Sequence, residues 1–399
     1  MRIAFISDGR AENFRRWVRY FGQQRDEVTV LSTYACDDME NCRVLTLPAI
    51  LHANGVFVRR SDKQNERERH AHFSHKLLSG GLGRRLYQYW SIVKTFDVLP
   101  KMIAARRILH NLKPDIVVAF RTQDEGYITA LVGNHPWVLF TQGSDFIYWA
   151  NRYRWHARLT RIAVQRADAL IADSQRDINL AKQYGFSKNC PCLLSPGNGG
   201  VDLSLYSAGG AAGQRERCVV FPRGLAPYIR FDTLLNSILS LQNEPDYSDV
   251  HYKLLVMPAF ISIVHQMLRR LNLNISKIEV LPFMSQHKLA ALLQKAAIIV
   301  SPSLTDGTPN SMLEAMACGA LPVMSNLESI REWICHGQNG LLFDPAEPQD
   351  LTKCLKIAIN NDTLRQKAQD LNIEIIRKRA DILNVMPGVR QFLMNVAGV

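Results

Sequence analysis

Long apolar runs are missing from this chain of 399 residues. None approaches the roughly 18–20 residues that a membrane-spanning helix needs. The eight cysteines form neither a dense disulfide framework nor a metal-binding spacing, and Cys190 and Cys192 stand too close together for a usual zinc pair. These absences disfavour a membrane-spanning, disulfide-stabilised or zinc-stabilised protein. We expect a reducing cytoplasmic compartment, and we expect residues 1–9 to form a first strand rather than a signal peptide.

Acidic residues are scarce in the first half of the chain. Residues 1–205 hold 29 Lys and Arg against 19 Asp and Glu, a net charge of +10, whereas residues 206–399 contribute only +2 to the total of +12. Such a basic half is typical of a protein with an anionic partner, and a membrane surface, an anionic lipid carrier or an acidic glycan would each serve. Nucleic acid is disfavoured, because no recognisable reader motif accompanies the charge.

Strand and helix patterns alternate along the chain, and 399 residues exceed one ordinary core, so two domains are expected. This alternation predicts an α/β protein with two Rossmann-like halves, each a parallel sheet covered on both faces, joined by a flexible linker at 207–217. Predicted strands are 3–6, 28–31, 116–120, 138–141, 169–172, 192–194, 218–221, 252–257, 278–281, 297–300 and 321–324. Predicted helices are 11–21, 87–109, 152–166, 177–184, 231–241, 260–271, 286–294, 309–318, 327–336, 348–360 and most of 363–395.

The most informative stretch is residues 301–323, SPSLTDGTPNSMLEAMACGALPV. The apolar run 297–300 before it predicts a buried parallel strand. Asp306 and Gly307 then predict a turn, and Pro309 suits the first turn of a helix. A loop at the carboxyl end of such a strand faces the ligand crevice of an open α/β sheet.

The same stretch brings a second carboxylate to that crevice. Glu314 lies about one and a half turns into the predicted helix, so its side chain returns toward the loop. A carboxylate there can accept hydrogen bonds from both hydroxyls of a ribose, while the loop N–H groups and the helix N-terminus attract a diphosphate. The segment therefore predicts a site for a nucleoside diphosphate.

This stretch resembles the signature of family 4 glycosyltransferases, in group 1, which are retaining enzymes of the GT-B fold. Their motif has two glutamates separated by seven residues; Asp306 and Glu314 keep that spacing, with Asp in place of the first Glu. The resemblance is strong over residues 190–360 and looser over 1–190. It implies two Rossmann-like domains facing an inter-domain cleft, an acceptor-binding domain at 1–205 and a nucleotide-sugar-binding domain at 206–375, with a final helix at 376–399 crossing back onto the first.

On the donor side, the resemblance implies that Asp306 orients the donor sugar and that Glu314 holds the ribose. Arg223, which follows the strand 218–221, matches the family's diphosphate-binding arginine, so Asp306 and Arg223 are the catalytic candidates. The family's lysine about five positions later is absent, and Arg230 is the nearest replacement, because a guanidinium also recognises phosphate. A structural arginine remains the alternative for Arg223. The remaining donor-binding candidates are Gly307, Thr308, Pro309, Asn310 and Ser311.

On the acceptor side, candidates follow several predicted strands of the first half. Gln142 stands where many family members have a histidine, and it can bind a sugar but cannot titrate, so no general base is expected there. The alternatives are a plain strand–helix turn for Gly9 and Asn13, a surface salt bridge for Arg121, and a helix cap for Ser144 and Asp145. The full candidate set for acceptor or sugar contact is Gly9, Asn13, Arg121, Gln142, Ser144, Asp145 and Asn198.

The resemblance implies a retaining hexosyltransferase that moves a sugar from a nucleotide sugar to a glycan, lipid-linked or small-molecule acceptor, as in polysaccharide biosynthesis. No Asp-x-Asp metal site follows a predicted strand, so neither a metal nor another cofactor is expected. We expect a cytoplasmic protein with an anionic membrane surface as a further partner. The alternatives are a nucleotide-sugar epimerase, a basic anion-binding protein, and a degenerate transferase that binds without catalysing.

Two further segments of the first half predict surface features. Residues 59–76 are polar and contain His70, His72 and His75. We interpret them as a mobile loop, with an acceptor or membrane contact as the alternative, and no carboxylate or cysteine completes a metal-binding spacing there. The basic segment 84–107 either packs on the sheet or lies on a lipid surface.

Overall fold

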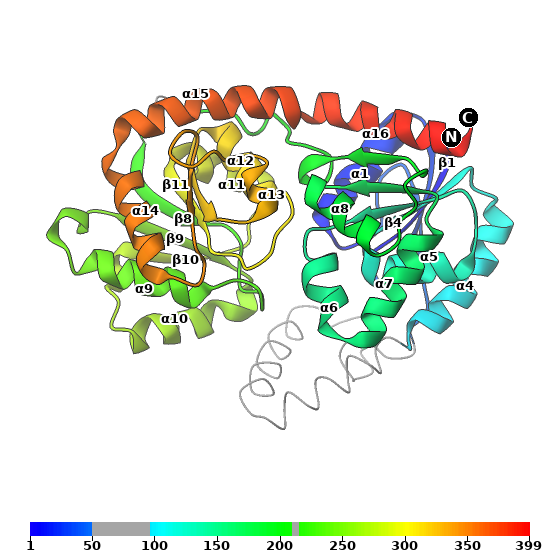
Figure 1. The fold of residues 1–399 in the computed structure, drawn as a ribbon, viewed down its shortest axis with the longest axis horizontal. Coiled ribbons are helices and arrows are strands. Elements are labelled where there is room, and N and C mark those ends of the chain that lie inside the picture. The colour runs from blue at the N-terminus through cyan, green and yellow to red at the C-terminus, as the bar shows by residue number, and fades with distance from the viewer. Residues whose placement is uncertain (50–95, 210–214) are drawn as a thin grey trace. The chain divides into compact units, whose positions relative to one another are not determined.

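The computed structural model describes residues 1–49, 96–209 and 215–399. The polar loop predicted at 59–76 lies outside the described residues, as do parts of the predicted helix 87–109, the basic segment 84–107 and the linker 207–217. Residue contacts divide the chain into two compact units (Figure 1). Unit 1 comprises Met1–Gly199 and Val385–Val399, and unit 2 comprises Gly200–Asn384.

Within its described residues, unit 1 contains a seven-stranded sheet in the order β3-β2-β1-β4-β5-β6-β7, with parallel pairing between neighbours. The chain adds strands on one side of β1 and then on the other, so the order reverses between β1 and β4. Ligands of open α/β sheets bind at such a switch point. The strands are β1 (Arg2–Ser7), β2 (Glu27–Ser32), β3 (Arg43–Thr46), β4 (Ile116–Phe120), β5 (Trp137–Thr141), β6 (Ala169–Ala172) and β7 (Cys192–Leu194).

An aromatic cluster joins the first helix of unit 1 to the sheet. Trp17 packs with ring centroids 5.1 Å from both Phe120 and Phe140, and these two phenylalanines stack at 4.4 Å. Fully buried side chains of this size account for much of a core's apolar burial. The helical segments of unit 1 are α1 (Glu12–Gln23), α4 (Val98–Leu112), η1 (Thr122–Gly126), α5 (Tyr127–Val132), η2 (Asp145–Trp149), α6 (Ala150–Arg152), α7 (Arg154–Arg166) and α8 (Gln175–Gln183).

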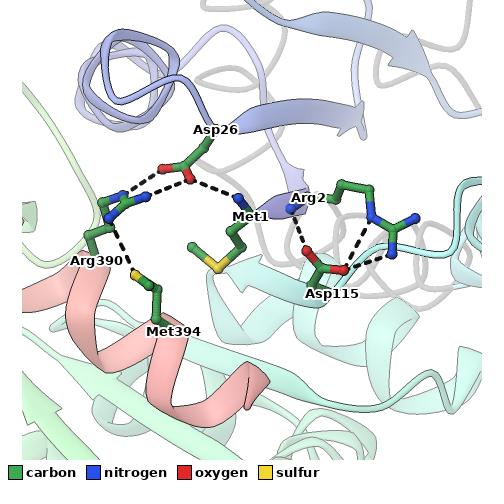
Figure 2. A network of polar contacts seen from close by, with 6 residues as sticks. All are labelled: Met1, Arg2, Asp26, Asp115, Arg390 and Met394. Carbon is green, nitrogen blue, oxygen red and sulfur yellow. Dashed lines mark hydrogen bonds and ion pairs between the residues drawn. The ribbon is translucent and has the colours of Figure 1, made fainter. Parts of the chain in front are cut away.

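The last helix, α16 (Ile382–Ala397), returns to unit 1 (Figure 1). It buries Met386, Val389 and Leu393. Figure 2 shows its polar anchor: the Arg390 guanidinium donates to both carboxylate oxygens of Asp26, at 2.8 and 3.0 Å, and the Met1 ammonium donates to the same carboxylate at 3.2 Å. A residue late in the chain thereby fixes the turn before β2.

Unit 2 repeats the architecture. Across its described part it contains a six-stranded parallel sheet in the order β10-β9-β8-β11-β12-β13, which reverses between β8 and β11. Its strands are β8 (Glu216–Phe221), β9 (His251–Val256), β10 (Ile278–Pro282), β11 (Ala296–Ser301), β12 (Leu321–Ser325) and β13 (Leu341–Phe343). Its α-helices are α9 (Phe231–Gln242), α10 (Ile261–Arg270), α11 (Gln286–Lys295), α12 (Asn310–Cys318), α13 (Glu328–Arg331), α14 (Pro348–Asn360) and α15 (Asp362–Arg379).

The predicted α/β class with two Rossmann-like halves is confirmed, and most strands begin and end within two residues of their predicted bounds. The predicted helix 327–336 was too long. It ends at Arg331, because the Asn339 side chain accepts from the Cys335 N–H and donates to the Trp333 carbonyl, which closes a turn instead. No helix among the described residues is both long enough and apolar enough to cross a bilayer.

Candidate functional site

An ion pair occupies the switch point of unit 2. Arg223 lies on the loop after β8 and Asp306 on the loop after β11, and these two strands are neighbours where the strand order reverses. The Arg223 Nη2 lies 2.5 Å from Asp306 Oδ2, with 20% and 13% of the two side chains exposed. The structure therefore brings together the two residues predicted to be catalytic, at the edge of the sheet where α/β proteins bind ligands.

The loop that carries Asp306 is held from two sides. The Gly307 N–H donates to Asp306 Oδ1 at 3.1 Å, and the Ser329 hydroxyl donates to the Asp306 carbonyl at 2.6 Å. The buried Thr308 hydroxyl accepts from the Trp333 indole at 3.1 Å. These bonds preorganise the loop, which lowers the conformational cost of ligand binding.

The loop after β8 is fixed against the same strand end. The Arg230 N–H donates to the Pro302 carbonyl at 2.7 Å, and Ile229 forms an antiparallel bridge with Ser303. The Arg230 side chain pairs with Asp232 at 2.9 Å and lowers the pKa of that carboxyl. The Asp232 carboxylate already neutralises this guanidinium, and the donor-binding role of Arg230 stays a prediction.

Helix α12 begins directly after this loop, with Pro309 as its N-cap and no side chain capping the first N–H groups. Glu314 lies on α12 and is 5% exposed. Two buried donors of this region, the Ser311 hydroxyl and the Arg223 Nε, have no hydrogen-bond partner among the described residues. Because buried polar groups are nearly always paired, two such donors beside an ion pair favour a polar ligand here. Asn310, also predicted to bind the donor, is the first residue of α12.

In unit 1, the loops after β4 and β5 meet at Asp145. This fully buried carboxylate accepts from the N–H groups of Thr122, at 2.9 Å, and Gln142, at 3.1 Å, and pairs with Arg121 at 3.4 Å. Burial raises its pKa, and Arg121 opposes that shift. Asp145 therefore positions Arg121 and Gln142. The Ser144 side chain does not cap the following helical turn.

Gly9 and Asn13 follow β1. The Gly9 N–H donates to the Ser32 hydroxyl at 3.0 Å, and a Cβ at this position would lie 2.5 Å from the Cys36 Sγ, so a larger residue would force neighbouring side chains to move. Asn13 lies in the first turn of α1, and its side-chain oxygen accepts from the Phe14 N–H. Asn198 follows β7, and its carbonyl accepts from the Trp17 indole at 2.7 Å.

Apart from Arg121, the sequence reasoning missed the residues between β4 and α5. Arg121 and Asp124 have positive φ angles of 138° and 59°, which are strained for residues with side chains. Glu125 is buried, and the Thr33 hydroxyl donates to it at 2.7 Å. Burial and the neighbouring Asp124 raise the pKa of Glu125 to about 8, with Arg121 opposing. Strain and a shifted pKa both cluster at functional sites, but neither signal is visible in a sequence.

These features define an α/β protein with two Rossmann-like units and an arginine–aspartate ion pair at the switch point of the second. Residues 266–373 match the family described as Glycosyl transferases group 1, and residues 82–174 match the family described as Glycosyl transferase 4-like. Both families are glycosyltransferases, and one match lies in each unit.

Curated relatives are similar over parts of the chain. An uncharacterized glycosyltransferase, MJ1178, of Methanocaldococcus jannaschii is 30% identical over 105 residues, covering 26% of this chain and 30% of the relative. The serotype-specific mannosyltransferase WbdA of Escherichia coli is 26% identical over 283 residues, covering 65% and 34%. A Campylobacter jejuni relative is named N,N'-diacetylbacillosaminyl-diphospho-undecaprenol alpha-1,3-N-acetylgalactosaminyltransferase, and it is 35% identical over 77 residues, covering 19% and 20%. The chain thus spans about a third or less of the length of these relatives.

Solved structures support the fold over the whole chain. Sucrose-phosphate synthase from Thermosynechococcus elongatus has a TM-score of 0.77 at 14% identity and covers 100% of this chain and 99% of its own. Anabaena HepE in complex with UDP-glucose has a TM-score of 0.71 at 16% identity, covering 99% and 100%. At such identities the likeness shows the GT-B fold.

Proposed function

We propose that the protein is a retaining, metal-independent glycosyltransferase that takes a hexose from a nucleoside diphosphate sugar. The Arg223–Asp306 pair at the switch point of unit 2 is the observation that carries this proposal. The unpartnered Ser311 hydroxyl and Arg223 Nε support it. The structural relative HepE was solved in complex with UDP-glucose, which favours a uridine nucleotide as the first donor to test.

The leaving diphosphate gains negative charge as the anomeric bond breaks, and a positioned cation lowers the barrier to that step. Arg223 is the cation of this site, and its free Nε and the first N–H groups of α12 supply further donors. Asp306 orients the donor sugar and Glu314 binds the ribose hydroxyls. The acceptor hydroxyl attacks on the face that the diphosphate leaves, and a phosphate oxygen takes its proton.

The acceptor side is assigned to unit 1, where Asp145 positions Arg121 and Gln142. A guanidinium suits a phosphate or carboxylate on the acceptor. The name of the C. jejuni relative contains a diphospho-undecaprenol, so a lipid-linked acceptor is one candidate beside a glycan. We propose a cytoplasmic protein, peripheral on a membrane, that serves polysaccharide synthesis.

Ligand-induced thermal stabilisation tests the donor site. The protein is heated with UDP, GDP, ADP and their sugars, with and without EDTA. We expect one nucleoside diphosphate to raise the melting temperature regardless of EDTA. Arg223→Ala should weaken its binding about 10–100-fold, since a hydrogen bond to a charged group contributes about 1.5–3 kcal/mol, and Glu314→Ala should also weaken it.

Arg217→Ala is the matched control, because Arg217 lies near the start of β8, at the end of the strand opposite to Arg223, and pairs with Asp249 on the surface. No stabilisation by any nucleotide would refute the donor site. Stabilisation without release of nucleoside diphosphate in the presence of glycan and lipid-linked acceptors would instead favour a degenerate transferase, for which Asp306 and Gln142 already depart from the family pattern. The anomeric configuration of any product, read by NMR, tests retention.

A further inference from the structure

Helix α7 presents a row of arginines to solvent. Residues 146–167 contain five arginines and no acidic residue. Within α7, Arg154, Arg158 and Arg161 are all exposed, and their spacing of four and three positions places them on one face of the helix.

The buried face of α7 fixes the orientation of the face that carries the arginines. His156, Thr160, Ala163 and Val164 of α7 are buried against unit 1, so the arginines cannot turn inward. Side chains of like charge at this spacing repel one another. The three arginines therefore form an electrostatically unfavourable group of like charges on the surface of unit 1.

Within the described residues, these arginines also lack the acidic partners that several other surface cations have. Arg217 pairs with Asp249, Lys356 with Glu244 and Lys378 with Glu374. In the part of the chain that the structure describes, no ion pair joins Arg154, Arg158 or Arg161 to an acidic residue. An anion from outside the chain would neutralise the row.

An aromatic group continues the arginine face at its N-terminal end. Tyr153 and Trp155 stack with centroids 4.4 Å apart, and the Arg152 guanidinium lies 5.4–5.6 Å from the rings of Tyr148, Trp149 and Tyr153. These four aromatic side chains are partly exposed, and Ile147 beside them is 37% exposed. The Trp155 indole N–H has no partner among the described residues. The result is a preformed patch of rings next to the row of arginines.

We propose that this α7 face, made of Arg154, Arg158 and Arg161 with Ile147, Tyr148, Trp149, Tyr153 and Trp155, docks on the surface of a bilayer that contains anionic phospholipids. Clustered arginines on a helix bind anionic headgroups. Tyr and Trp prefer the level of the headgroups, where a ring is half buried and its polar atom stays wet. A soluble polyanion would use the arginines but would leave the exposed isoleucine and the indole without a role.

The biological role of this docking rests on the proposed function, because docking would bring the enzyme to a lipid-linked acceptor. Binding to lipid needs no nucleotide-sugar donor, however, so the docking surface and the donor site can each be refuted without the other. The arginine face lies on α7 of unit 1, whereas the donor residues lie on unit 2.

Vesicle flotation tests the proposal with the full chain. Vesicles of phosphatidylcholine alone are compared with vesicles containing phosphatidylglycerol. We expect binding only to the anionic vesicles and weakening by salt, which screens exposed charges. The variant R154Q/R158Q/R161Q should partition on the order of 100-fold less, from three arginines near the surface. W155A should partition several-fold less while its binding to heparin stays unchanged.

The matched control R269Q/R270Q/K288Q removes the same charge from exposed positions of unit 2 and should bind vesicles like the wild type. Equal binding by the arginine variant and the wild type would overturn the proposal, as would binding to heparin without binding to vesicles. The nucleotide-induced thermal shift is measured on every variant. A wild type that binds vesicles but shows no shift would refute the donor site and leave the docking surface standing.

Discussion

At the scale of single residues, the loop after β4 contains a buried carboxyl group, that of Glu125, whose pKa is raised. Glu125 belongs to the strained turn that begins at Arg121, yet its carboxyl reaches the hydroxyl of Thr33, which follows β2. Since β1 lies between β2 and β4 in the sheet, this hydrogen bond spans the switch point of unit 1. A neutral Glu125 joins these two loops without placing a charge in the interior.

The stability of the protein should therefore fall as pH rises through the range where only the unfolded chain loses this proton. The pKa of Glu125 rises from 4.5 to about 8 on folding. Between these values the unfolded state releases the proton and the folded state keeps it, so about 1.4 kcal/mol of unfolding free energy is lost per pH unit. Below that range the carboxyl is protonated in both states, and above it the loss levels off.

Glu125→Gln stays neutral in both states and should lack this decline. Urea unfolding of the wild type and the variant at several pH values across the window measures the difference. Glu216→Gln is the control, because the Glu216 side chain is 53% exposed and should leave the pH profile unchanged. Parallel profiles for Glu125→Gln and the wild type would show that Glu125 is ionised in the folded protein.

The sequence indicated the positions of the donor candidates in the fold better than it indicated their contacts. Asp306 and Glu314 belong to one short motif with a fixed spacing, and Arg223 follows a strand that its apolar pattern predicts. Their proximity, however, depends on the pairing of β8 with β11 and on the Ser329 and Trp333 side chains that hold the loop after β11. Glu125 was missed because its partner Thr33 is 92 residues away in sequence. Its pKa shift arises from burial, which a single sequence does not reveal.

At the scale of elements, the buried carboxylate of Asp26 provides a polar attachment of α16 to unit 1. The Asp26 side chain is almost fully buried and pairs with both the Met1 ammonium and Arg390, whose side chain is 28% exposed. Asp26→Asn would leave two cations without their counter-charge. We expect a loss of about 2–3 kcal/mol, less than for a wholly buried pair because Arg390 keeps some hydration.

Hydrogen exchange of the α16 amides measures this loss directly, since local opening controls exchange. Asp115→Asn is the matched control in the same region of Figure 2. Asp115 accepts from the Arg2 backbone and side chain, but half of the Arg2 side chain is exposed, so we expect a loss below about 1 kcal/mol. Equal effects of the two substitutions would mean that Asp26 is not the main anchor of α16.

The elements that sequence patterns missed are short or irregular. Strand β3 (Arg43–Thr46) has no apolar run, because it lies at the edge of the sheet and its end residues are exposed. Helix α5 (Tyr127–Val132) follows a strained turn that no local propensity favours. In both cases pairing and burial within unit 1 override the local signal. The long interior strands were predictable, because a strand buried on both faces has a continuous apolar sequence.

At the scale of the whole molecule, the chain passes from unit 1 to unit 2 after Gly199 and returns after Asn384, so each unit has its own sheet and core. We therefore expect calorimetry to resolve two transitions. The nucleoside diphosphate that binds the donor site should raise only the transition of unit 2, because Arg223, Asp306 and α12 belong to it. Asp26→Asn should lower only the transition of unit 1. Effects at distant, independent sites add, so the variant with ligand should show both shifts unchanged. A single transition that responds to both perturbations would mean that the two units unfold as one cooperative body.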